Sequence, residues 1–145
     1  MKTEMVSNFK YESCISDDGT VSVRNVAVKP DGETFQEICG YADVPDPNYP
    51  AELQVHFPFS PTGDYWILDT DYDNYVSIYS CQDTFGLFKI EFAWILVRDP
   101  DNVPQEIRDK AMEAFTKQNL ATNEFEEVVN DGCTYENPSG DPPCS

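Results

Sequence analysis

The sequence predicts one all-β domain, an up-and-down antiparallel β-barrel of about seven to eight strands with one α-helix packed outside it near the C-terminus. Residues 6–97 read as short β-forming runs separated by turn residues, with no helical period. Residues 104–118 do carry a helical period, and 145 residues make about one domain. Because an open meander exposes two strand edges, closure into a barrel is expected.

The expected strands follow one another through the first two thirds of the chain. Turn residues at 16–19 and 30–32 separate the first three runs. Apolar and polar residues alternate clearly where Leu53, Val55 and Phe57 lie at every second position. The seven predicted strands are 6–14, 20–28, 34–41, 52–57, 65–70, 75–81 and 87–97.

A helix and a short strand are expected after these runs. Prolines within 99–104 provide helix-start signals, and Ile107, Ala111, Ala114 and Phe115 form one apolar stripe before Asn119 ends the helix. A last strand is expected at 125–129. The barrel domain is therefore predicted to occupy residues 1–131, and 132–145 to form a C-terminal tail.

Charge and hydropathy limit the partners of the chain. Nine Lys and Arg against 27 Asp and Glu give a net charge of −18, which repels phosphate backbones and anionic headgroups, so no nucleic acid partner is expected. The longest apolar run, 92–97, is far below the roughly 20 residues of a membrane-spanning helix. No membrane span is expected.

The cysteines indicate an oxidising compartment and no metal. The chain has no Cys-x-x-Cys pair and a single histidine, so a metal site is not expected. An extracellular location is favoured, although residues 1–8 lack the apolar stretch of a signal peptide. Residues 14 and 39 would lie two strands, or about 9.6 Å, apart, too far to bridge, whereas 133 and 144 close easily. The disulfide candidates are Cys14, Cys39, Cys81, Cys133 and Cys144.

An alternating aspartate motif resembles the start of a calcium loop. Asp69, Asp71 and Asp73 lie at the right spacing, but Asn74 replaces the required glycine and Ser80 the bidentate glutamate. Carboxylates that support a hairpin turn are the better interpretation.

The single histidine does not predict catalysis. His56 is expected on the polar face of its strand, and no nucleophile motif such as G-x-S-x-G accompanies it. A catalytic triad is therefore not expected.

An aromatic stripe carries the functional prediction. Residues 88, 90, 92, 94 and 96 put large apolar side chains on one face of a strand, while Lys89, Glu91 and Ala93 share the other. This stripe is either part of a filled core or the wall of a pocket for a flat conjugated or steroid-like ligand. Alternation predicts the wall residues Val23, Phe35, Phe57, Tyr79, Phe92 and Trp94.

Two segments, 65–81 with its Thr-Asp-Tyr and Tyr-Ser-Cys elements and 92–98, resemble signature regions of the lipocalins, in particular the apolipoprotein D, insect bilin-binding and crustacyanin groups. The resemblance implies that Thr70, Asp71 and Tyr72 are structural and that Arg98 closes the barrel floor. It also implies that Trp94 and Tyr11 line a ligand cavity, which favours the pocket over the filled core.

One departure from the family pattern concerns the first strand. The opening Gly-x-Trp region has no counterpart, so the barrel would be one strand short, and Arg98 would be exposed, hydrated or covered by another group. The cysteines that family members pair with the equivalents of Cys81 and Cys133 are also absent.

The predicted function is non-enzymatic binding, transport or sequestration of a small hydrophobic ligand. A bilin or carotenoid chromophore is the first candidate, with a sterol, retinoid or fatty acid second, and no cofactor is required. The alternative is a structural or surface-interaction subunit, joined as a homodimer or higher oligomer through an open strand edge. A lipocalin-fold isomerase that uses Cys81 or Cys14 as nucleophile is less favoured.

Overall fold

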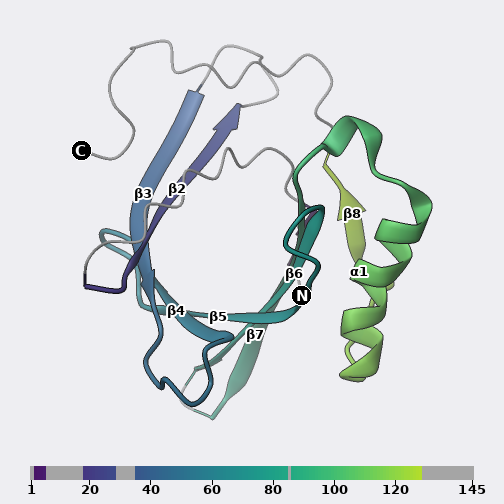
Figure 1. Ribbon diagram of the computed structural model, residues 1–145. Helices are drawn as coiled ribbons and strands as arrows, with labels where there is room; N and C mark the ends of the chain where they lie inside the picture. Colours follow the sequence, from purple (N-terminus) through teal and green to yellow (C-terminus); the bar gives the residue numbers. More distant parts are fainter. Residues whose placement is uncertain (1, 6–17, 29–34, 85, 129–145) are drawn as a thin grey trace.

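A computed structural model describes residues 2–5, 18–28, 35–84 and 86–128 of the chain. Their strands form one sheet in the order β2-β3-β4-β5-β6-β7-β1-β8. Figure 1 shows this sheet curled around a central space, with α1 on the outside of the curl beside β6 and β8. The sheet therefore has a concave face and an outer face.

Short turns and alternating side chains set the element boundaries. The elements are β1 Lys2–Met5, β2 Val21–Val28, β3 Phe35–Asp43, β4 Glu52–His56, β5 Gly63–Thr70, β6 Tyr75–Thr84, β7 Phe88–Val97, a 3₁₀ turn Pro100–Asn102, α1 Gln105–Lys117 and β8 Phe125–Glu127. The helix is one residue shorter at each end than expected. Asn119 has a φ of 58°, a left-handed conformation that ends helices, and the Leu120 N–H donates to the Phe115 carbonyl at 3.0 Å.

Strands β2 to β7 form a continuous antiparallel meander. Because successive strands reverse direction, the β2–β3, β4–β5 and β6–β7 connections lie at one end of the sheet. We call this the β6–β7 end, and the opposite end, with the β3–β4 and β5–β6 connections, the β5–β6 end. A bulge between Ile67 and Asp69 shifts the register of β5 against β6 and sharpens the local twist.

A cluster of buried side chains, which we call the helix-side cluster, lies between α1 and the outer face of the sheet. The predicted helical stripe supplies Ala111 and Phe115, both 0% exposed, which pack against Tyr75, Ala93 and Ile95 of β6 and β7. Alanine at 111 lets the helix approach closely enough for the Ser77 hydroxyl to donate to the Ala111 carbonyl at 2.8 Å. Among the described residues, α1 therefore covers the outer face of the sheet where β5, β6 and β7 lie.

The sheet differs from the expected closed antiparallel barrel at its edges. Strand β1 was not predicted because Lys2–Met5 has no apolar alternation, and it pairs in parallel with β7 and β8. Among the described strands, β2 and β8 are the two ends of the order, so these strands form a curled half-barrel. The predicted strand at 6–14 and the tail at 132–145 lie outside the described residues.

Candidate functional site

The apolar stripe of β7 lies on the concave face and becomes more exposed along its length. Leu96 is 9% exposed, Trp94 and Phe92 are half-buried, and Ile90 and Phe88 are 41% and 58% exposed. The intervening residues Ala93 and Ile95 belong to the helix-side cluster on the outer face, so the residues of the stripe point to the concave face. The concave face is thus closed by packing at the β5–β6 end and accessible toward the β6–β7 end.

Two aromatic rings form the middle of this face. Phe92 and Trp94 stack with their centroids 5.6 Å apart and their planes 7° from parallel. Across the β6–β7 ladder, Trp94 pairs with Ile78 and Phe92 pairs with Ser80, which are 0% and 3% exposed. The two rings therefore rest on a fully packed floor and keep part of their own surface accessible.

A glycine allows a third aromatic ring onto the concave face. A Cβ on Gly40 of β3 would lie 2.6 Å from Cδ1 of Phe57 and 2.2 Å from the His56 carbonyl oxygen. No side chain fits in that space, so glycine is required for the ring of Phe57 to cross β3 here.

Four of the predicted wall residues lie on the concave face. Val23 pairs with Gly40, Phe57 covers Gly40, and Phe92 and Trp94 are in the β7 stripe. The register adds residues that the predicted wall did not include. Directly paired residues of neighbouring strands point to the same face, so the pairing of Trp94 with Ile78 can be followed strand by strand to β3. The residues placed on the concave face in this way are Ala42, Leu53, Val55, Tyr65, Ile67 and Ile78.

Tyr79 corrects the predicted wall, because the structure places it on the outer face. It packs in the helix-side cluster, 6.0 Å from the ring of Trp66. Its hydroxyl donates to Oε1 of Glu91 at 2.5 Å, and burial together with this bond raises the pKa of Tyr79. Tyr11 lies outside the described residues, as does the side chain of Phe35, whose backbone pairs with Val28.

The four motif residues build the turn at the β5–β6 end. The Thr70 hydroxyl donates to the Tyr75 carbonyl at 2.6 Å and accepts from the Tyr72 N–H at 3.0 Å. Arg98 is exposed, and its Nη2 and Nε donate to the Tyr72 carbonyl at 2.9 and 3.3 Å. This contact holds Tyr72, which has a φ of 66°, against the end of β7.

Asp71 is the acceptor at the centre of the same turn. Its Oδ1 accepts the N–H groups of Asp73, Asn74 and Tyr75, and its Oδ2 accepts from Nδ2 of Asn74 at 2.7 Å. Partial burial works to raise its pKa, but the bonds from Asn74, Tyr75 and Asp73 outweigh it and lower the pKa to about 2. All these contacts are internal to the hairpin.

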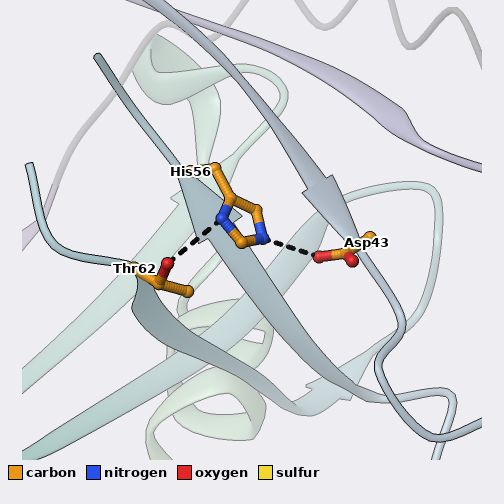
Figure 2. A network of polar contacts seen from close by, with 3 residues as sticks. All are labelled: Asp43, His56 and Thr62. Carbon is orange, nitrogen blue, oxygen red and sulfur yellow. Dashed lines mark hydrogen bonds and ion pairs between the residues drawn. The ribbon is translucent and has the colours of Figure 1, made fainter. Parts of the chain in front are cut away.

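His56 joins three segments on the outer face near the β6–β7 end. Figure 2 shows its ring between Asp43 of β3 and Thr62, which precedes β5. Nε2 is 2.8 Å from Oδ1 of Asp43, Nδ1 is 3.2 Å from Oγ1 of Thr62, and the ring stacks on Tyr41 with a centroid distance of 4.5 Å. With both nitrogens and one ring face engaged, His56 braces the β4–β5 loop against β3.

Other chemistry is sparse in the described part of the chain. No group of three or more His, Cys, Asp or Glu residues is placed to hold a metal ion there, and no helix there is long and apolar enough to cross a membrane. An apolar hollow between α1 and β7 has room for little more than a water molecule. Cys39 is disulfide-bonded and Cys81 is a free thiol, whereas Cys14, Cys133 and Cys144 lie outside the described residues.

The model of the lipocalin / cytosolic fatty-acid binding protein family matches residues 5–131 of the chain. This match covers most of the chain, and the curled meander with its external helix agrees with it. The protein belongs to this family.

Individual relatives agree with this assignment. Apolipoprotein D from Mus musculus is 39% identical over 108 residues, which are 70% of this chain and 57% of that protein. Apolipoprotein D from Macaca fascicularis is 33% identical over 120 residues, 82% of this chain and 62% of that protein. The chain therefore spans about three fifths of the length of these curated relatives.

Solved structures show the same fold. Lobster apocrustacyanin A1 superposes with a TM-score of 0.69 at 26% identity, over 88% of this chain and 74% of that one. H1 crustacyanin from the lobster Homarus americanus gives a TM-score of 0.68 at 26% identity with the same coverage.

Proposed function

We propose that the protein binds a small hydrophobic ligand on the concave face, for transport or sequestration and without transforming it. The observation that carries this proposal is the β7 stripe, whose stacked Phe92 and Trp94 keep accessible surface above a buried floor. Rings that served only the core would be buried like Phe115 on the other side of the sheet. The family name, which includes fatty-acid binding proteins, supports the same chemistry.

Burial of the ligand supplies the affinity. Enclosing about 300 Å² of apolar ligand surface at about 25 cal/mol per Å² gives up to about 7 kcal/mol before ordering costs. This corresponds to micromolar binding or better. Reduced water contact, rather than a specific polar group, is thus the main driving force.

A bilin or carotenoid is the first ligand class we propose, and a sterol, retinoid or fatty acid the second. The support is the near-parallel orientation of Phe92 and Trp94, since a flat conjugated molecule continues such a stack with offset ring contacts. The similarity to the crustacyanins and the five cysteines of the chain support our proposal of an extracellular carrier.

Catalysis by Cys81 is not part of the proposal. Its thiol packs against the helix-side cluster on the outer face, across the sheet from the stacked rings. A ligand on the concave face would lie on the far side of the sheet from this sulfur.

The two tryptophans allow a direct test, because they lie on opposite faces. The experiment titrates a bilin, a carotenoid, a retinoid and a fatty acid separately and follows tryptophan fluorescence. We expect saturable quenching that Trp94→Phe removes and that Trp66→Phe preserves, since Trp66 packs against the outer-face cluster. Absence of saturable binding by a correctly folded chain, or quenching that depends on Trp66 alone, would contradict the proposal.

A further inference from the structure

Two serines of β6 are buried on opposite faces of the sheet. Ser77 is 0% exposed and pairs with Ile95 of the helix-side cluster, whereas Ser80 is 3% exposed and pairs with Phe92 of the concave-face stripe. Both side chains end in a hydroxyl, which can donate one hydrogen bond and accept others. The two positions can therefore be compared directly, because they share residue type, strand and degree of burial.

The fold satisfies one of these hydroxyls and not the other. Ser77 donates to the Ala111 carbonyl of α1 at 2.8 Å, whereas the Ser80 hydroxyl makes no hydrogen bond within the part of the chain that the structure describes. A buried hydroxyl without a partner costs free energy, and most buried polar groups in folded proteins have a partner. Alanine would fill the position of Ser80 without this cost, so folding alone does not explain the hydroxyl.

Ser80 lies in the middle of the candidate site. Phe92, its partner across the β6–β7 ladder, stacks on Trp94, and the register of β5 against β6 places Tyr65 on the other side of Ser80. Ser80 is thus the small residue between two aromatic ones. The ring of Phe92 keeps part of its own surface accessible, so its rotation can bring a bound ligand next to the hydroxyl.

We propose that the Ser80 hydroxyl forms a hydrogen bond with an uncharged oxygen of the ligand, a hydroxyl or a carbonyl, when the ring of Phe92 turns aside. This inference rests on the proposed function, because it assigns the polar contact of the same concave site. Burial still supplies most of the affinity. Ser80 selects, among apolar ligands, those with an oxygen that reaches it.

The surroundings of Ser80 favour an uncharged group over an ionised one. The pairing of β2 to β7 places every charged residue of these six strands on the outer face, as it does Asp64, Lys89 and Glu91. A carboxylate brought to Ser80 would lose its water among apolar side chains, and the Ser80 hydroxyl alone would not compensate for that loss. A hydroxyl or carbonyl oxygen is less costly to bury, and one hydrogen bond satisfies it.

The experiment measures retinoid binding to the full chain by the quenching of tryptophan fluorescence. The probes are retinol, which ends in a hydroxyl, axerophthene, the hydrocarbon with the same polyene and a methyl end, and retinoic acid, which ends in an ionised carboxylate at about pH 8. Each probe is titrated into the native chain, Ser80→Ala and Ser77→Ala. The last variant is the matched control, because it deletes the equivalent hydroxyl on the opposite face.

We expect retinol to bind about five- to tenfold more weakly to Ser80→Ala than to the native chain, because one hydrogen bond is lost. Axerophthene should bind both chains equally, and retinoic acid should bind the native chain more weakly than retinol does. Ser77→Ala should leave all three affinities unchanged and lower the urea midpoint of the unliganded chain, since the bond to α1 is lost. Ser80→Ala should not lower that midpoint.

Four results would overturn the inference. The first is equal retinol affinity in the native chain and Ser80→Ala, and the second is an equal loss of axerophthene binding, which would assign the effect to packing. The third is a lowered urea midpoint in Ser80→Ala, which would show that the hydroxyl stabilises the fold. The fourth is retinoic acid binding as tightly as retinol, which would contradict the uncharged oxygen.

The inference and the proposed function fail in different ways. If retinol and axerophthene bind and Ser80→Ala changes neither affinity, only the assignment of Ser80 is wrong. If no retinoid binds, that assignment is also wrong. The proposed function fails with it only when the bilin, the carotenoid and the fatty acid do not bind either.

Discussion

At the scale of single residues, close approaches and turn contacts decide what each position tolerates. Gly40 and Asp71 are the clearest cases, because each makes several close contacts within one hairpin or one pair of strands. Gly40 provides space that no side chain can share, and Asp71 provides an acceptor that no neutral side chain reproduces. Gly40 makes room for Phe57 on the concave face, whereas Asp71 organises the turn between β5 and β6.

Replacing Gly40 should destabilise the sheet beside Phe57. In Gly40→Ala the new Cβ meets a backbone oxygen at 2.2 Å, and backbone cannot rotate away, so we expect a loss of about 2–3 kcal/mol in unfolding free energy. Gly63→Ala is the control, since its nearest neighbour would be Cγ1 of Val55 at 3.4 Å, and its loss should stay below about 1 kcal/mol. Urea denaturation measures both, and equal losses would refute this account of Gly40.

Asp71 should make stability depend on acid. Its folded pKa of about 2 lies below the ordinary value of 3.8, so the stabilisation is present above about pH 4 and is lost as the pH falls through 2. Because the turn is solvent-exposed, we expect only about 1 kcal/mol. Urea denaturation from pH 5 to pH 2 should show this component in the native chain and in Asp73→Asn but not in Asp71→Asn. A component that survives in Asp71→Asn would assign it to other carboxylates.

At the scale of elements, the packing on each face of the sheet explains what the sequence could predict. The helix and most strand positions were confirmed because turn residues and the 3.6-residue period mark them clearly. The face of Tyr79 was wrong for a physical reason: β6 is apolar on both faces, since α1 covers Tyr75 and Tyr79 while Ile78 lies on the other side. In such a strand, the alternation of apolar and polar residues does not distinguish the two faces. Only the pairing of Ile78 with Trp94 shows which residues of β6 lie on the concave face.

The β4–β5 loop should loosen when its brace is removed. His56→Ala deletes the contacts to Asp43 and Thr62 and the stack on Tyr41, so amide exchange in residues 57–62 should accelerate several-fold, with about 1 kcal/mol lost in stability. Thr62→Val removes one contact and should give a smaller effect. Hydrogen exchange with mass spectrometry measures both, and unchanged exchange in His56→Ala would show that the loop is held by other contacts.

At the scale of the whole molecule, the family, the curled sheet and the external helix were predictable, but the edges of the sheet were not. Lys2–Met5 pairs with β7 and β8, but its sequence has no apolar alternation that could be detected. Val23, Phe57, Phe92 and Trp94 share the concave face, as alternation within their strands predicts, whereas the positions of Ala42 and Ile67 follow only from the pairing of several strands in order. Long-range register is the information that a single sequence carries least clearly.

The separation of the two faces has a consequence for redesign. The helix-side cluster of Tyr75, Ala93, Ile95, Ala111 and Phe115 lies across the sheet from Phe92 and Trp94. Above the buried floor of Ile78 and Leu96, concave side chains can be exchanged with little loss of packing. New ligand specificities could therefore be selected from libraries at these positions while the scaffold remains intact.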